Sequence, residues 1–383
     1  MKNKKLGLNS AISAILFVFL LTACGSESSN NETNSSDENS GSKQEFNFRI
    51  SSGINNLHPW HIGMFQPWVE QIEAESDGAM SFDVFTGGEL VQFGNEYDAL
   101  RDGTIDMSFT IAALYDPQRF PYTEAVQLPL LNSNSTIAST AMYNLMNSDE
   151  ILTGGKTYYE IEFADKGIVA YANPLTDPYV FGTRGVEFET VDDFTKNIRL
   201  RSSSRVTEFL INNLNTSAIS MPATDAYDAL SRNALDGLFY EIPGWNSLGY
   251  DELLNYAIEG IYFGHGATHT GMTEETWNQL PEEYQEIIQK ASDEIIFTAA
   301  EYQQSLEEEG KDIYMSNGGE FIHFNDLDPS VQEHFNNAIV KTWFDWIENL
   351  ESEGHAGKQM AILWRDAILD AGGEVPQQIM EIE

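Results

Sequence analysis

Arginine is the residue type whose distribution in this chain most clearly suggests chemistry. Four of the nine arginines fall between residues 184 and 205, in a chain with 60 acidic residues and a formal charge of −40. They are Arg184, Arg199, Arg201 and Arg205. A guanidinium presents a planar fork of donors that matches a carboxylate with two parallel hydrogen bonds. The cluster therefore predicts a carboxylate-binding site, although the same arginines could instead balance acidic neighbours.

The other motifs that could carry chemistry are incomplete. His58 and His61 have a spacing that metals can use, but Pro59 lies between them and no third ligand is near. Gly155-Lys156-Thr157 resembles the end of a phosphate loop, yet Glu150 occupies the position of its first glycine. The G-x-S-x-G motif of hydrolases does not occur. We therefore expect no cofactor, no metal and no enzyme activity, although a hydrolytic pair of carboxylates stays open in so acidic a chain.

The single cysteine, Cys24, follows the sequence features of an exported protein. Basic residues at 2–5 precede an apolar run over residues 6–21, and Leu21-Thr22-Ala23 stands directly before the cysteine. These features are typical of a secretory signal peptide that is too short to span a membrane. The residues before Cys24 resemble the lipobox of bacterial lipoproteins, in which this cysteine carries the lipid. We expect a signal peptide over residues 1–23 and lipidation at Cys24; the alternative is a plain signal anchor with an incidental cysteine.

The stretch that follows the cysteine has the composition of a linker. Residues 25–44 contain no aromatic or aliphatic side chain, so they cannot bury enough apolar surface to offset the entropy cost of ordering. We therefore expect a flexible tether over residues 24–45. Stable anchoring would need more than one acyl chain, because a single chain binds a bilayer only marginally.

The charge of the chain limits its partners. Removal of three leader lysines with the signal peptide takes the formal charge from −40 to −43. Such an excess of acid keeps a protein soluble and argues against nucleic acid or anionic lipid as a partner. It resembles the acidic surfaces of salt-adapted proteins.

Strands and helices alternate in two blocks that would position the arginines. Strands are expected at residues 46–51, 80–85, 105–109, 198–201 and 235–240, and helices at 60–77, 89–102, 206–214 and 223–231. This alternation predicts parallel α/β sheets, and two blocks predict two lobes. Arg199 and Arg201 are two apart in one strand, so they would point to the same face.

A long helix is expected in the last third of the chain. Pro281 followed by two glutamates is a strong helix start, and no glycine or proline interrupts the sequence before Gly310. Twenty-eight residues would give a helix of about 42 Å. The apolar positions do not hold a heptad, so we prefer a brace across both lobes to a coiled-coil arm.

A series of short motifs, in a specific order, carries a resemblance that covers nearly all of residues 46–383. They are Arg49-Ile50-Ser51 through His58-Pro59-Trp60, Gly87-Gly88-Glu89-Leu90, Leu100 through Met107, Leu128-Pro129-Leu130-Leu131, Ile198-Arg199-Leu200-Arg201, Met221 through Tyr227, and Ala234-Leu235-Asp236-Gly237. Together they resemble the DctP-like solute-binding proteins of tripartite ATP-independent periplasmic (TRAP) transporters.

The resemblance implies a two-lobed, periplasmic-binding-protein-like α/β fold. Each lobe would be a sheet flanked by helices, and the long helix would brace both. Lobe I is expected to comprise residues 46–178 plus about 265–310, and lobe II about 179–264 plus 311–383. The lobes of such proteins close on the ligand.

The resemblance also assigns roles to individual residues. Arg201 would grip a ligand carboxylate and Arg184 would support it, whereas Arg199 and Arg205 carry no such role. Further residues expected to line the site are His58, Thr110, Ala223 and Thr224. The chain departs from the family pattern where a short polar residue is common, because Tyr240 and then Trp245 follow the Asp-Gly motif. Two aromatic side chains would favour an apolar or planar ligand; alternatively, Trp245 is core packing.

The function implied by the resemblance is capture of a small organic acid. The protein would sit on the extracytoplasmic face of the cell membrane, held by its lipid, and deliver the acid to TRAP membrane subunits. A ligand-presenting sensory or adhesion protein for a membrane receptor is the alternative that the sequence leaves open. A secreted enzyme is a third class, and no complete motif supports it.

Overall fold

The computed structural model describes residues 44–383, which form one compact unit. The expected signal peptide, Cys24 and nearly all of the expected tether lie outside the described residues. Within residues 44–383, no helix combines the length and the apolar character that crossing a bilayer would require.

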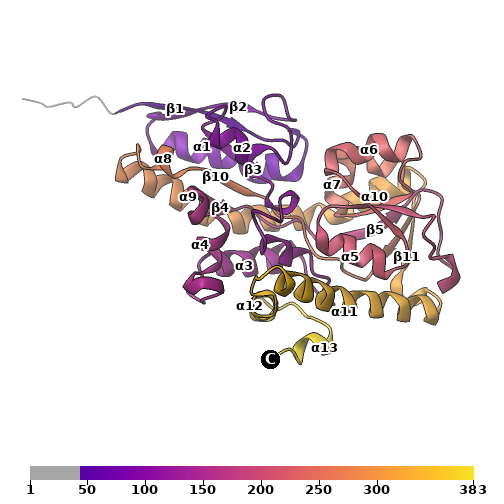
Figure 1. The fold of residues 1–383 in the computed structure, drawn as a ribbon. Helices are drawn as coiled ribbons and strands as arrows, with labels where there is room; N and C mark the ends of the chain where they lie inside the picture. Colours follow the sequence, from indigo (N-terminus) through magenta and orange to yellow (C-terminus); the bar gives the residue numbers. More distant parts are fainter. Residues whose placement is uncertain (1–43) are drawn as a thin grey trace, which may run out of the picture. The chain divides into compact units, whose positions relative to one another are not determined.

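The first sheet has five strands and contains the first strands of the chain (Figure 1). They are β1 (Phe46–Ser51), β2 (Met80–Phe85), β3 (Met107–Ile111), β4 (Ile168–Ala172) and β10 (His269–Thr273), in the order β2-β1-β3-β10-β4. β1 is parallel to β2 and β3, as predicted, but β10 is antiparallel to β3 and β4. The chain leaves this sheet after β4 and returns to it only with β10, which enters from the opposite end and therefore runs antiparallel to its neighbours.

The second sheet has six strands, which come from the middle of the chain and from residues 320–323. They are β5 (Val180–Thr183), β6 (Arg199–Ser202), β7 (Ser217–Ser220), β8 (Gly237–Tyr240), β9 (Tyr256–Glu259) and β11 (Glu320–His323), in the order β11-β9-β5-β8-β6-β7. β6 is parallel to β7 and β8, whereas β5 is antiparallel to both of its neighbours. The predicted fold class, α/β with two sheets flanked by helices, is confirmed.

The helices of the second sheet lie close to their predicted positions. They are α5 (Arg205–Asn213) and α6 (Ala223–Ser231), whereas α7 (Ile242–Leu248) was not predicted. Ser204 caps α5, because its hydroxyl accepts a hydrogen bond from the Thr207 amide. Leu210 and Ile211, on the apolar face of α5, pack in the core of the second sheet.

The predicted helix over residues 89–102 is wrong in its first half. Only α2 (Glu96–Arg101) is helical, because Gly94 adopts a φ of 95° and breaks the pattern. The spacing of Leu90, Phe93, Tyr97 and Leu100 suggested one helix face, but Leu90 is exposed and Phe93 is buried from an irregular turn. The predicted helix over residues 60–77 consists of a short π-helical turn, His61–Phe65, followed by α1 (Gln66–Glu75).

The long predicted helix is present and reaches both cores. It consists of α9 (Glu282–Ser305) and α10 (Glu307–Ser316), interrupted only at Leu306. Buried residues of α9 such as Ile288 pack with the β1–β3 side of the first sheet, whereas Tyr314 of α10 packs in the core of the second sheet. The helix runs through Gly310, where a Cβ would lie 2.8 Å from Cγ2 of Ile242, so glycine permits α10 to approach α7 closely.

The C-terminal helices add a second connection between the cores. In α11 (Pro329–Ser352), Phe335 belongs to the core of the second sheet, while Trp343 and Trp346 belong to a core beneath α3 (Ser135–Met146). α12 (Gly357–Asp370) lies beside α11 and also packs against α3 (Figure 1). Within the expected lobe II, α11 packs against α5, whereas α12 packs against α3 of the expected lobe I, and the lobe boundaries stay a prediction.

Candidate functional site

Arg201 is a buried cation near the end of β6. The residue is 1% exposed. Its Nε donates to the Met221 carbonyl at 3.1 Å, and Nη2 donates to the Tyr115 hydroxyl at 2.6 Å. Nη1 is buried and has no hydrogen-bond acceptor among residues 44–383. Since a buried charged donor without an acceptor is costly, this atom marks a place where a ligand acceptor would be stabilised.

Tyrosines surround this guanidinium. The Arg201 Cζ lies 5.8 Å from the ring centre of Tyr240, within the range of a cation–π contact. Tyr179 stacks on Tyr240 with ring centres 5.4 Å apart, and Tyr250 meets it edge-on at 5.5 Å. Burial raises the pKa of Tyr115, Tyr179, Tyr240 and Tyr250. The site is therefore a cation enclosed by neutral aromatic groups that keep their protons.

Two of the clustered arginines are paired with acids, as the alternative interpretation held. Arg199 forms a bidentate pair with Asp236, with Nη2 and Oδ1 2.9 Å apart, and its side chain is 38% exposed. Arg205 is paired with Glu124 and with Glu353. Arg201 has no acidic partner of this kind among the described residues.

The structure does not bring Arg184 to Arg201. The register of β5 against β8 pairs Val180 with Tyr240, so Arg184 lies beyond the opposite end of that strand pair. Its Nη1 donates to the Leu230 carbonyl at 2.7 Å and to Asn233 Oδ1 at 2.5 Å. This side chain stabilises the end of α6, and we leave it out of the candidate site.

His58 lies in the loop after β1 and faces a buried carboxylate. Its Nε2 is 3.5 Å from Oε1 of Glu241, and both side chains are at most 1% exposed. Nδ1 accepts a hydrogen bond from the Trp60 amide at 3.2 Å, so in a neutral imidazole Nε2 carries the proton. Burial lowers the pKa of His58 to about 3 and raises that of Glu241 well above its usual range. Burial therefore favours the neutral form of both groups in the absence of a partner.

Thr110 organises the loop that carries His58. Its hydroxyl donates to Oε1 of Glu96 at 3.1 Å and accepts from the Gly53 amide at 3.0 Å. Burial raises the pKa of Glu96 to about 8. Because these contacts occupy the Thr110 hydroxyl, its predicted contact with the ligand stays a prediction.

The remaining predicted residues fall in three environments. Ala223 is buried, and its carbonyl accepts a hydrogen bond from the Tyr250 hydroxyl, so it lies in the tyrosine cluster. Thr224 is exposed at the start of α6. Trp245 is 1% exposed, and its Nε1 donates to the Tyr240 carbonyl at 3.2 Å while its ring packs edge-on against Tyr314. Trp245 therefore lies in the core beneath Tyr240, as the core-packing alternative held.

Sequence reasoning missed Tyr115, Tyr179 and Glu241. Tyr115 ends a short turn after β3, and Tyr179 ends the connection between the two sheets, so neither belongs to a motif with Arg201. Glu241 directly follows Tyr240, and an acid beside the predicted aromatic wall was a signal that could have been used.

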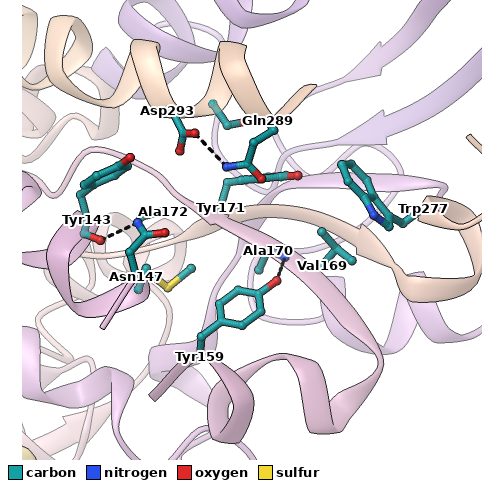
Figure 2. Close-up of a pocket in the computed structure, with 12 residues that line it drawn as sticks. Tyr143, Asn147, Tyr159, Val169, Ala170, Tyr171, Ala172, Trp277, Gln289 and Asp293 are labelled. Atoms are coloured by element: carbon teal, nitrogen blue, oxygen red, sulfur yellow. Dashed lines mark hydrogen bonds between the residues drawn. The ribbon is translucent and has the colours of Figure 1, made fainter. Parts of the chain in front are cut away.

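A separate cavity of about 370 Å³ lies between α3, α9, β4 and the short helix α4 (Tyr158–Glu162) (Figure 2). Several of its polar groups already have partners: Asn147 Nδ2 donates to the Tyr143 carbonyl, and Gln289 Nε2 donates to Asp293. Asp293 is its one charged lining residue, so this cavity has no counter-charge for a carboxylate. The Arg201 cluster is the better candidate for binding an acid.

Asp177 is a buried carboxylate in the first connection between the sheets. It is 3% exposed, and its Oδ1 accepts from the Ser135 amide at the start of α3 at 2.9 Å. Oδ2 has no hydrogen-bond partner among the described residues. Burial raises the pKa of Asp177 to about 7, with Glu307 and Glu241 adding to the rise and Lys311 opposing it.

We expect Asp177→Asn to stabilise the protein at pH 8 and to have little effect at pH 4. A folded pKa of about 7, above the unfolded value of about 3.9, means that the folded state holds an extra proton between these pH values. The free energy of unfolding therefore falls as the pH rises through this window, and the neutral amide removes that fall. The gain at pH 8 is bounded by about 4 kcal/mol. Urea unfolding at both pH values measures it, with exposed Asp312→Asn as the control; an equal effect at pH 4 and pH 8 would contradict the assignment.

The fold and site define a class of protein: an α/β binding protein with two sheets and a buried cation enclosed by tyrosines. Residues 50–348 match the family described as DctP, bacterial extracellular solute-binding protein, family 7. The chain belongs to this family, which confirms the resemblance in the motifs. It is a family of substrate-binding proteins that act in transport outside the cytoplasm.

Relatives and solved structures agree with this placement. A monocarboxylate 2-oxoacid-binding periplasmic protein of Nostoc sp. is 23% identical over 320 residues, which are 80% of this chain and 81% of the relative. A TRAP solute-binding protein of Rhodoferax ferrireducens, solved with benzoate, has a TM-score of 0.73 at 19% identity and covers 85% of this chain and 98% of its own. A marine metagenome TRAP protein specific for aromatic acids, solved with 3-hydroxybenzoate, has a TM-score of 0.75 at 19% identity, covering 86% and 99%. At these identities the structures establish the fold.

Proposed function

We propose that this protein captures a small organic acid by its carboxylate on Arg201 and delivers it to the membrane subunits of a TRAP transporter. One observation carries the proposal. Arg201 is the most deeply buried arginine of residues 44–383, yet it lacks the acidic partner that Arg49, Arg199 and Arg205 have. A buried cation without a counter-ion is stabilised when an anion binds beside it.

The walls of the site favour a planar or apolar ligand body. Tyr179 and Tyr240 stack beside the guanidinium and offer flat apolar faces. Relatives of similar fold were solved with benzoate, 3-hydroxybenzoate and mandelate, which are small acids with an aromatic ring. These ligands suit a site with a buried guanidinium beside stacked tyrosine rings.

Contacts from both sheets support capture by lobe closure. Nη2 of Arg201, on the second sheet, donates to Tyr115, which follows the last residues of β3 in the first sheet. Gln127 and Ser203 form a second such contact, with Nε2 and Oγ 3.0 Å apart. A ligand that contacts both sides stabilises the closed arrangement by binding it more tightly than the open one.

Lipidation of Cys24 and a tether over residues 24–45 complete the proposal. A lipid anchor would hold the body at the outer face of the cell membrane, within reach of membrane subunits. Incorporation of labelled palmitate into wild-type protein, and its loss in Cys24→Ser, would test the anchor.

A ligand screen on residues 44–383 tests the binding function. Thermal unfolding is followed with benzoate, 3-hydroxybenzoate, mandelate and 2-oxoacids, in saline buffer because screening weakens repulsion within an acidic protein. An acid present at a hundred times its Kd should add about 2.7 kcal/mol to the free energy of unfolding. Calorimetric titration confirms each hit. Absence of binding by every carboxylate in such a screen would contradict the proposed function.

A further inference from the structure

We propose that Glu241 is a second recognition point and that the preferred ligand is an amphoteric acid, whose carboxylate binds Arg201 and whose primary or secondary ammonium group binds Glu241. This inference deepens the proposed function and rests on it. It narrows the ligand class from organic acids in general to amino and imino acids.

Glu241 differs from the other buried glutamates of the described residues in having no hydrogen-bond partner from another residue. It is 1% exposed, and neither Oε1 nor Oε2 has a partner within residues 44–383. By contrast, Glu124 is paired with Arg205, and Glu162 accepts from the amides of Tyr122 and Thr123. Burying a carboxyl group without a hydrogen-bond partner is unfavourable. A hydrogen-bond donor on a bound ligand would therefore stabilise Glu241.

Glu241 lies within electrostatic range of Arg201 and of the tyrosines around it. It follows Tyr240, whose ring lies 5.8 Å from Arg201 Cζ. The charge of Arg201 acts on the titration of Glu241, and both residues act on that of Tyr179. Arg201 and Glu241 nevertheless form no ion pair with each other, although both side chains are fully described. A buried guanidinium without a counter-ion and a nearby carboxyl group that a cation would ionise match the two ends of a zwitterion.

The chain also makes room for this carboxylate. A Cβ on Gly244, in the first turn of α7, would lie 2.3 Å from Oε1 of Glu241 and 2.7 Å from Cε1 of Tyr240. Glycine at this position therefore leaves the space that the carboxylate and the tyrosine ring occupy. On the other side, His58 Nε2 approaches Oε1 to 3.5 Å, which is beyond a normal hydrogen bond and leaves the oxygen available.

The protonation state of Glu241 gives the inference a second readout. Without a cationic partner burial keeps the carboxyl protonated, and a ligand ammonium would favour its ionised form. The charged and titratable groups within electrostatic range are Arg201, His58, Asp177, Tyr115, Tyr179, Tyr240 and Tyr250. Binding of an amino acid at pH 7 should therefore release about one proton per ligand, whereas binding of a plain acid should release none.

Matched ligands test the inference directly. Calorimetric titration compares phenylglycine, mandelate and phenylacetate, which share a carboxylate and a ring and differ in an ammonium, a hydroxyl or a hydrogen. Alanine, lactate and propionate form a smaller set with the same differences. We expect the amino acid to bind at least about tenfold more tightly than the acid without a donor, as one charge-assisted hydrogen bond would give. Titrations in two buffers of different ionisation enthalpy measure the proton release.

Glu241→Gln should remove the preference for the amino acid and leave the affinity for the plain acid unchanged or higher. Glu96→Gln is the matched control, because Glu96 is an equally buried glutamate whose oxygens already accept from Gly94 and Thr110. If Glu241→Gln failed to fold, the ligand preference and proton release of the wild type would decide the question by themselves.

The outcomes separate this inference from the proposed function. Wild-type protein that binds phenylacetate or propionate as tightly as the amino acid would overturn the inference and leave the acid-binding function standing. The same holds if plain acids bind tightly only with sodium present and not with choline, because the cation beside Glu241 would then come from the buffer. If neither amino acids nor plain acids bind, the proposed function itself fails.

Discussion

Replacing Arg201 with alanine is expected to weaken binding of the cognate acid by more than about 100-fold. The variant removes the one buried cation of the tyrosine cluster, and loss of one partner of a buried ion pair costs about 3–5 kcal/mol. The ligand carboxylate would then be buried against neutral hydroxyls alone. Calorimetric titration of wild type and variant with the same acid measures the effect.

Arg199→Ala is the matched control for this experiment. Arg199 lies two residues away in β6, but its guanidinium is paired with Asp236 near the surface, so its loss should leave the affinity within about twofold. Unliganded Arg201→Ala should unfold at a similar or higher temperature than the wild type, because it removes an unpaired buried charge. Wild-type affinity in a folded Arg201→Ala protein would refute the role of this residue.

Replacing Arg205 with methionine is expected to lower the free energy of unfolding by about 3–5 kcal/mol. The Arg205 Nε lies 2.7 Å from Oε2 of Glu124, which is fully buried, and the Arg205 amide donates to Oε1 at 2.7 Å. Nη1 also reaches Glu353 of the segment after α11 at 2.8 Å. Without the guanidinium, the Glu124 carboxylate would be buried with no cation, and its pKa, already raised by burial, would rise further. Urea unfolding measures the change.

Two controls decide whether the loss comes from the buried carboxylate. Arg232→Met removes a solvent-exposed arginine paired with Asp228 and should cost less than about 1 kcal/mol. The double variant Glu124→Leu with Arg205→Met should recover part of the stability, because it removes the stranded acid together with its partner. A loss in Arg205→Met no larger than that in Arg232→Met would show that the pair contributes little.

These two arginines illustrate how one sequence cluster separates into different roles. Arg201 and Arg205 are four residues apart, on either side of the turn that joins β6 to α5. Arg205 meets a carboxylate supplied by the protein, and Arg201 meets only the hydroxyl of Tyr115 and a carbonyl. The sequence shows that both are arginines in an acidic chain. Only the tertiary contacts show that Arg201 lacks an acidic counter-ion and is available to a ligand carboxylate.

Local patterns predicted those elements whose hydrogen bonds and buried faces are contained in a short segment. The strand over residues 46–51 and the helix over residues 223–231 have the predicted bounds. The pattern failed at residues 89–95, where a left-handed glycine holds Val91 and Phe93 in the core without a helix. The direction of β10 was also not accessible, because it depends on where the chain re-enters the first sheet.

The sequence by itself determined the α/β class, the long bracing helix and the family, and it predicted Arg201 as the carboxylate-binding residue. Each of these depends on local spacing or on the order of short motifs. Tertiary structure alone decided which groups meet that guanidinium. Tyr115, which follows β3 of the first sheet, and Tyr240 of β8 both contact Arg201, and neither has a fixed spacing to it along the chain. Tertiary packing also placed Trp245 in the core and Arg184 at the far end of its strand. The groups of the candidate site come from separate segments that meet only in the folded protein, so no single stretch of the chain encodes the site.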